Sequence, residues 1–166
     1  MENLFENNGA EFSECKKYRY KLWRIWDETK PIAMVIGLNP STANADKPDP
    51  TISILKRMLT KLGYGGFYMM NLFTIISSKP GILKGEIYKD IFDWQNCLEI
   101  LIEVGHRKTV IFGWGDFKEA KERGEEIKRV FPNAFCFGKS KSGAPLHPLA
   151  LMYNGTQGNP KLIKFN

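Results

Sequence analysis

The order of apolar and polar runs along the chain predicts strands that alternate with helices. Three runs are almost continuously apolar, which is typical of central strands covered on both faces: "PIAMVIGL" (31–38), "GFYMMNLF" (66–73) and "TVIFGWG" (109–115). The more alternating "YRYKLWRIW" (18–26) indicates a strand near a sheet edge, and "AFCFG" (134–138) a last short strand.

Helical patterns fill the gaps between these strands. The first predicted helix has Asp49 as its N-cap and Pro50 in its first turn, and Gly63 is suited to ending it. Two further helices are predicted over residues 90–105 and 116–131, the latter with Asp116 as its cap. Strands that alternate with helices imply parallel pairing with right-handed crossovers. The expected fold is therefore α/β, with three layers (α/β/α) around a mainly parallel sheet of four to five strands.

The chain length of 166 residues fits one domain. We expect residues 1–15 to be a loose N-terminal leader and residues 16–166 to form a single α/β domain. A long loop is expected over residues 74–89, and the segment from Lys139 onward is rich in Gly, Pro and Ser.

Composition excludes several classes of protein. Hydrophobic residues make up 43% and charged residues 25%, and no apolar run approaches the roughly 20 residues that span a bilayer. The start, "MENLFENNGAEFSECKK", is polar and acidic, unlike a signal peptide. Three well-separated cysteines form no metal-binding pattern. We expect a soluble cytoplasmic protein with no membrane partner, metal or cofactor.

The formal charge of +6 allows two interpretations. Part of it lies in "CKKYRYKLWR" and "GKSKSG", and basic clusters favour phosphate-bearing partners such as nucleic acids or nucleotides. Lysine-rich surfaces also simply keep proteins in solution. Neither interpretation fixes the oligomeric state.

Candidate functional residues follow the strands. Ligands of open α/β sheets bind at the carboxyl ends of the strands, and four segments are expected there: "GLNPS", "MNLFT", "FGWGD" and the loop with "LHPL". Asn39 has an amide suited to positioning a water or substrate, and its other interpretation is an Asx-type turn in which it only shapes the loop before proline. Asn71 is suited to reading the edge of a base, or to bonding nearby loop backbone.

His147 and the acidic residues complete the candidate chemistry. A neutral His147, held before Pro148, is able to donate a hydrogen bond to a leaving group, the alternative being a solvated side chain. Asp46 and Asp49 are the nearby carboxylates, and Asp49 also has the structural role of helix cap. Trp114 either lines a pocket or covers the core.

These four segments, in this order, resemble the uracil-DNA glycosylase superfamily. "GLNPS" is similar to the motif whose Asn positions the attacking water, "MMNLFTI" to the strand whose Asn reads a flipped base, and "IFGWGDFKEA" to the strand that ends in a Trp-Gly turn. "LHPL" resembles the His-Pro motif whose His donates to the base as the glycosidic bond breaks. The residues after His147 and Pro148, "LALMY", depart from the Ser-Pro-rich turn that grips duplex DNA.

A second resemblance covers nearly the whole chain from Tyr18 onward. "RYKLWRIW", "LNPSTANADKPDPT", "GYGGFYMMNLF" and "KSGAPLHPL" are identified with the uncharacterised family DUF1643. That name carries no activity, so function is inferred from the superfamily resemblance and from the residues.

The resemblance implies a uracil-DNA glycosylase-like fold and an N-glycosidase, that is, a hydrolase acting on a base in DNA or on a nucleotide. Asn39 and His147 would then be catalytic. Substrate would be bound by the loop and strand-end residues Gly37, Leu38, Pro40, Ser41, Asp49, Asn71, Phe73 and Trp114. The aromatic side chain that stacks on the base would be Phe73, Phe67 or Trp114.

Two alternatives stay open. One is a non-catalytic nucleotide-binding or DNA-binding protein that sequesters or inhibits, for instance in a phage or defence system, since Asn39 is no general base. The other is a metal-dependent phosphate-handling enzyme built on Asp46 and Asp49, although no Walker-type phosphate loop accompanies them.

Overall fold

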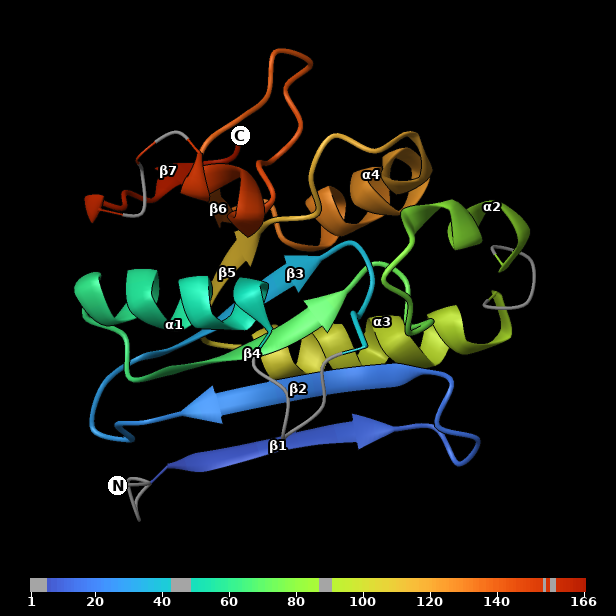
Figure 1. Ribbon diagram of the computed structural model, residues 1–166, viewed down its shortest axis with the longest axis horizontal. Coiled ribbons are helices and arrows are strands. Elements are labelled where there is room, and N and C mark those ends of the chain that lie inside the picture. Colours follow the sequence, from blue (N-terminus) through green and yellow to red (C-terminus); the bar gives the residue numbers. More distant parts are fainter. Residues whose placement is uncertain (1–5, 43–48, 87–90, 154, 156–157) are drawn as a thin grey trace.

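The computed structural model of the 166-residue chain describes residues 6–42, 49–86, 91–153, 155 and 158–166. In this part of the chain seven strands form one sheet in the order β1-β2-β4-β3-β5-β6-β7 (Figure 1). The strands are β1 (Asn7–Phe12), β2 (Arg19–Ile25), β3 (Ile32–Gly37), β4 (Gly66–Asn71), β5 (Thr109–Phe112), β6 (Phe135–Cys136) and β7 (Ile163–Lys164).

The middle of the sheet is parallel and its edges are antiparallel. Strand β3 pairs in parallel with β4 and β5, and β5 pairs in parallel with β6. Strands β1, β2 and β7 add antiparallel pairs at the two edges. The predicted α/β class is confirmed, but the sheet is mixed, with three parallel and three antiparallel pairs, where a mainly parallel sheet was expected. The expected four to five strands also fall short of the seven observed in the described residues.

Strand β1 lies within residues 1–15, which the sequence predicted as a loose leader. Apart from Phe12 at its end, its side chains are polar or small, so they carry no apolar period. The strand is held by backbone pairing along β2, from Asn7 opposite Ile25 to Phe12 opposite Arg19. Edge strands need little apolar character on their outer side, and this explains why the pattern gave no signal.

Helices cover both faces of the sheet. The α-helices are α1 (Pro50–Lys61), α2 (Leu83–Glu86), α3 (Ile91–Gly105) and α4 (Lys121–Val130), and the 3-10 turns are η1 (Pro80–Ile82), η2 (Lys118–Ala120) and η3 (Pro148–Met152). Successive residues of β3 enter different core clusters: Ala33 and Val35 pack with α1, whereas Met34 and Ile36 pack with α3 and α4. Figure 1 accordingly shows α1 in front of the sheet and α3 behind it.

The first helix begins where the sequence predicted, and α4 does not. Asp49 caps α1 by accepting a hydrogen bond from the Thr51 N–H, with Pro50 in the first turn. Asp116 caps no helix, because η2 intervenes and α4 starts only at Lys121. The Asp116 carboxylate instead accepts hydrogen bonds from two serine hydroxyls, Ser140 at 3.0 Å and Ser142 at 2.6 Å.

A shift of register in the β1–β2 pair changes which face Arg19 occupies. Glu11 lies opposite Lys21, yet the next residue of β1, Phe12, lies opposite Arg19, so β2 contains one extra residue. Without that bulge Arg19, three residues before Leu22, would lie on the other face of the sheet. With it, Arg19 shares the face of Leu22, which is the face that α1 covers.

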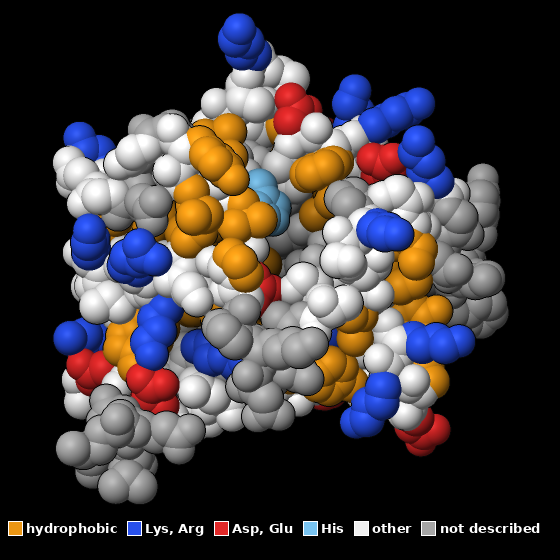
Figure 2. Space-filling view, in the orientation of Figure 1, with side chains coloured by type: hydrophobic (Ala, Val, Ile, Leu, Met, Phe, Trp, Pro, Cys, Tyr) orange, Lys and Arg blue, Asp and Glu red, His pale blue; other side chains and the backbone are white. Residues whose placement is uncertain are grey.

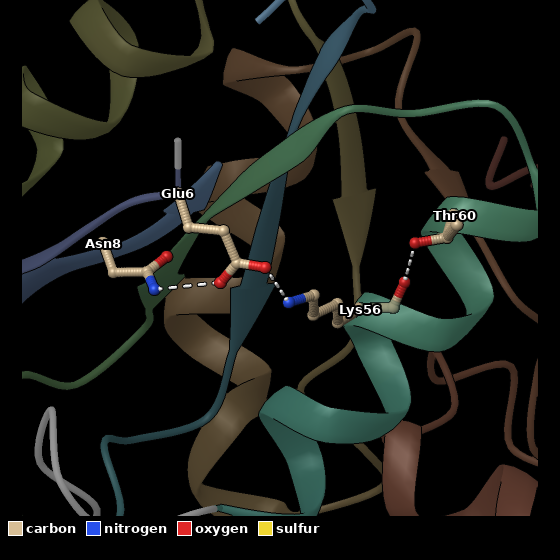
Figure 3. Close-up of polar contacts among 4 residues, drawn as sticks. All are labelled: Glu6, Asn8, Lys56 and Thr60. Atoms are coloured by element: carbon tan, nitrogen blue, oxygen red, sulfur yellow. Dashed lines mark hydrogen bonds and ion pairs between the residues drawn. The ribbon is translucent and has the colours of Figure 1, made fainter. Parts of the chain in front are cut away.

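An ion pair ties the N-terminal edge to the same face. Glu6, directly before β1, accepts from Lys56 of α1 at 2.7 Å and from Asn8 at 3.3 Å (Figure 3).

In the described part of the chain no helix is both long and apolar enough to cross a membrane.

Candidate functional site

A cavity of about 390 Å³ opens at the carboxyl ends of β3 and β4, beside the first turn of α1. Figure 2 shows this face hollowed near its middle, with a histidine side chain beside hydrophobic ones. The wall combines charged, amide, hydroxyl and apolar groups: Arg19, Leu38, Asn39, Ser41, Asp49, Thr51, Ile52, Met69, Asn71, Ser77, Ser78, Phe117, His147, Leu149 and Ala150. The structure therefore brings Asn39, Asn71 and His147, which come from three of the strand-end segments, to one cavity together with Asp49.

Asn39 follows β3 and connects the loop after β3 to the loop after β4 by hydrogen bonds. Its Nδ2 donates to the carbonyl oxygens of Pro40 at 3.2 Å, Ile75 at 3.4 Å and Ser77 at 3.0 Å. The Ser77 N–H donates in turn to the Pro40 carbonyl, which joins the same two loops. The amide nitrogen is thus committed to the backbone, so Oδ1 is the atom that a bound water or ligand would contact.

Asn71 ends β4 directly opposite Gly37 of β3. Its side chain is buried, and Oδ1 has no hydrogen-bond partner in the described part of the chain. A Cβ on Gly37 would lie 2.9 Å from this oxygen and 2.6 Å from Cε of Met69. Gly37 therefore acts by leaving room for Asn71, and the buried acceptor that results needs a donor from a ligand or water.

His147 is held in one orientation at the start of η3. Its Nδ1 accepts a hydrogen bond from the Leu149 N–H at 3.1 Å, so a neutral ring carries its proton on Nε2. Burial lowers the pKa of His147, and the nearby Asp49 carboxylate opposes that shift. Gly115, at a φ of 82°, lets the Phe117 ring and His147 lie against its loop. The site thus presents a neutral imidazole with an Nε2–H donor.

Asp49 serves both as helix cap and as the carboxylate of the cavity. One oxygen accepts from Thr51 N–H at 2.7 Å and the other accepts from the Ser41 hydroxyl. These two donors fix the orientation of the carboxylate. Asp46, its predicted companion, lies outside the described residues, and within those residues no three His, Cys, Asp or Glu side chains are grouped to hold a metal ion.

Arg19 brings a positive charge into the same wall. The residue is only 3% exposed, and burial lowers the pKa of the guanidinium to about 10, with the Asp49 carboxylate opposing the shift. The guanidinium therefore remains protonated at neutral pH. Two of its nitrogens, Nε and Nη1, have no hydrogen-bond partner among the residues described.

The expected aromatic residues do not line the cavity. Phe73 and Trp114 are buried in the core cluster beneath α3 and α4, where Arg123 packs on the Phe73 ring and Phe112 on Trp114. Phe67 is fully buried in the cluster under α1. The aromatic side chain at the cavity is Phe117, two residues after the Trp-Gly turn.

Other members of the predicted binding set divide in the same way. Leu38 and Ser41 line the cavity, whereas Gly37 and Pro40 shape the loop behind it. Sequence reasoning missed Arg19, Ser77, Ser78 and Phe117 at the cavity. Position after a strand end could have pointed to Phe117, but Arg19 depends on the β2 bulge, for which the sequence has no recognisable signal.

Comparison with known proteins identifies a family and nothing further. A family model described as "Protein of unknown function (DUF1643)" matches residues 19–149. The match spans β2 through the start of η3 and so includes every residue of the cavity wall except Ala150. Searches of curated proteins and of solved structures found no match to the chain.

Proposed function

The chain belongs to the DUF1643 family, and from the residues that share its cavity we propose that it is an N-glycosidase-like protein acting on a base in nucleic acid or on a nucleotide. One observation carries the proposal. The Leu149 N–H occupies Nδ1 of His147, so a partly buried, neutral imidazole keeps an Nε2–H donor at a cavity whose wall also includes Asn71, the side chain with a buried, unpartnered Oδ1. A donor and an amide at one cavity are the groups that recognise a base and stabilise its departure.

The chemistry follows from the charges that develop. A water oxygen bonds to the anomeric carbon as the bond from that carbon to the base nitrogen breaks, and the bonding electron pair leaves with the base. His147 donates from Nε2 to the base oxygen that gathers negative charge, while Asn39 holds the water through Oδ1. The attacking water loses a proton to solvent and the departing base takes one up, so the products are a free base and a sugar hydroxyl.

The remaining wall suits a flat, partly apolar ligand. Leu38, Met69 and Leu149 provide apolar surface, and Phe117 is available to stack on a base. The sequence resemblance of "GLNPS", "MMNLF" and "LHPL" to the uracil-DNA glycosylase superfamily supports the same assignment of Asn39, Asn71 and His147.

A second candidate is a non-catalytic binder that holds a nucleotide in this cavity. The three bonds from Asn39 Nδ2 to backbone carbonyls favour it, because they give that residue a structural role that needs no chemistry. Both oxygens of Asp49 likewise already accept hydrogen bonds from Thr51 and Ser41. In that case the ligand stabilises the protein and dissociates without any chemical change.

The test is release of free base, measured by chromatography, from uracil-containing and undamaged oligonucleotides and from a panel of nucleosides and nucleotides. Replacement of His147 by Asn keeps an acceptor for Leu149 N–H and removes the Nε2 donor, so this variant is expected to fold and to lose activity by about 100-fold or more. The exposed His106, replaced by Asn, is the matched control. No base release by the wild-type protein from any member of the panel would refute the enzymatic proposal and leave the binder.

A further inference from the structure

Arg19 is a buried cation without hydrogen-bond partners for two of its nitrogens. The residue is only 3% exposed, and Nε and Nη1 find no acceptor in the described part of the chain. The backbone N–H of Arg19 donates to the Thr74 carbonyl oxygen, so the groups of this residue without a partner are the guanidinium nitrogens Nε and Nη1. Buried arginines ordinarily pair with a carboxylate or a carbonyl, because an uncompensated buried charge is costly.

Asp49 does not supply that pair. Its carboxylate is close enough to act on Arg19 electrostatically, yet it makes no ion pair or hydrogen bond with it, and its two oxygens are held by Thr51 and Ser41. The α1 N-terminus lies at the same wall, where Thr51 and Ile52 line the cavity. A helix N-terminus adds positive potential to the guanidinium.

We propose that the ligand of this cavity carries an anionic phosphate group that pairs with Arg19, and that it is therefore a mononucleotide. This inference deepens the proposed function, on which it rests for the identity of the base-bearing part. The phosphate oxygens accept from the Arg19 guanidinium, and the base lies toward His147 and Asn71. Arginine suits this role because its planar fork of N–H donors matches the oxygens of a phosphate.

The size of the site favours a single nucleotide over a strand. A volume of about 390 Å³ lies at the lower end of the roughly 300–1,000 Å³ typical of small-molecule pockets. Proteins that bind single strands instead track the backbone with an extended basic groove. The cavity has one arginine, and no other Lys or Arg is part of its described wall.

The experiment measures binding by calorimetry and by thermal shift, without requiring turnover. The probes are the four common ribonucleosides, their 5′-monophosphates, inorganic phosphate and a short single-stranded oligonucleotide. The proteins are the wild type, Arg19→Gln, Arg19→Met and Arg19→Lys. Arg129→Gln is the control, because Arg129 is exposed on α4, on the other face of the sheet, and the substitution removes one positive charge equally.

At least one monophosphate is expected to bind the wild type about 10- to 100-fold more tightly than its nucleoside. That advantage disappears in Arg19→Gln and Arg19→Met, is partly kept in Arg19→Lys, and is unchanged in Arg129→Gln. Without ligand, Arg19→Met is expected to melt at a higher temperature than the wild type, because an apolar side chain removes an uncompensated buried charge. A fall in melting temperature for Arg19→Met would show that the guanidinium is satisfied within the protein and would overturn the proposal.

Other outcomes separate the two proposals. Equal affinity for nucleoside and monophosphate, or equal losses in Arg19→Gln and Arg129→Gln, would overturn the phosphate site. Binding of the oligonucleotide that depends on Arg19, without binding of any monophosphate, would overturn the mononucleotide. If a monophosphate binds in a way that depends on Arg19 but no base is released, this inference stands and the glycosidase proposal is refuted. If base is released from uncharged nucleosides at a rate independent of Arg19, the glycosidase proposal stands and the phosphate site is refuted.

Discussion

The backbone N–H of Leu149 donates to Nδ1 of His147 over 3.1 Å, which fixes the tautomer of the one histidine in the cavity wall. The same bond caps the first turn of η3, with Pro148 in its first position. A ring held in this way cannot exchange its donor and acceptor nitrogens without losing a helix cap. Protonation of Nδ1 would break the cap and would also place a charge on a partly buried ring.

Acidification should therefore destabilise the protein through His147. Burial lowers its folded-state pKa below the ordinary value near 6.5, so in the unfolded chain this side chain binds a proton at a higher pH than in the native protein. The free energy of unfolding then falls as pH drops through about 6.5, until the folded-state pKa is reached. Urea denaturation of the wild type and of His147→Asn at pH 7.5, 6.5, 5.5 and 5.0 measures this, and the His147→Asn curve should be flatter. Parallel curves would contradict the prediction.

Replacement of Gly37 by Ala should disturb the cavity floor. The new Cβ would lie 2.6 Å from Met69 Cε and 2.9 Å from Asn71 Oδ1, so both side chains must shift, at a cost of about 1–3 kcal/mol in the free energy of unfolding. The matched control is Gly113→Ala, just after β5, where the nearest atom, Pro148 Cδ, would be at an ordinary 3.5 Å. Denaturation of the two variants should differ clearly, and similar losses would show that the space at Gly37 is not what matters.

The central strands were predictable because burial on both faces leaves a continuous apolar signal, as in Ile32–Gly37 and Gly66–Asn71. The edges were not. Strand β7 consists of the exposed Ile163 and Lys164, and β1 is polar or small except for Phe12, so backbone pairing defines both strands. Asp116 has the residue type of a cap, but the hydroxyls of Ser140 and Ser142, distant in sequence, hold it elsewhere.

For the site, sequence position predicted which strand ends converge but not which side chains turn inward. Asn39, Asn71 and His147 meet at one cavity because parallel strands end at one edge. Phe73 follows Asn71 by only two residues and yet packs on the opposite side, under Arg123. Arg19 is present at the cavity only because one extra residue in β2 reverses the face it occupies.

Replacement of Asp49 should separate its role as cap from its role as charge. Asp49→Ala removes the acceptor for Thr51 N–H and for the Ser41 hydroxyl, with an expected loss of about 1–2 kcal/mol in the free energy of unfolding. Asp49→Asn keeps a capping oxygen and should cost less, while removing the negative charge beside Arg19 and so tightening the binding of anions. Chemical denaturation and phosphate titration of both variants test this. If Asp49→Asn weakened anion binding, the carboxylate would be orienting Arg19 instead of opposing its ligand.

The ion pair between Glu6 and Lys56 should hold β1 to the rest of the molecule (Figure 3). The hydrogen bond from Lys56 is the main cause that lowers the pKa of Glu6 below its ordinary value near 4.5. Because the folded-state pKa is lowered, the stabilisation is fully present above pH 4.5 and is lost as the pH falls through the folded-state value. The pair is partly exposed, so Glu6→Gln should cost only about 0.2–1 kcal/mol, and less in high salt.

The effect should be local, because Glu6 and Lys56 are 50 residues apart and join an edge strand to a helix. Amide hydrogen exchange of residues 7–12 is expected to accelerate in Glu6→Gln and in Lys56→Gln, with no further change in the double variant. The control is Glu125→Gln, which breaks a 2.6 Å ion pair with Lys128. Both residues lie within α4, so this ion pair joins no separate elements. Exchange in β1 that accelerates equally in Glu125→Gln would show that general loss of stability, and not this contact, governs opening of the edge.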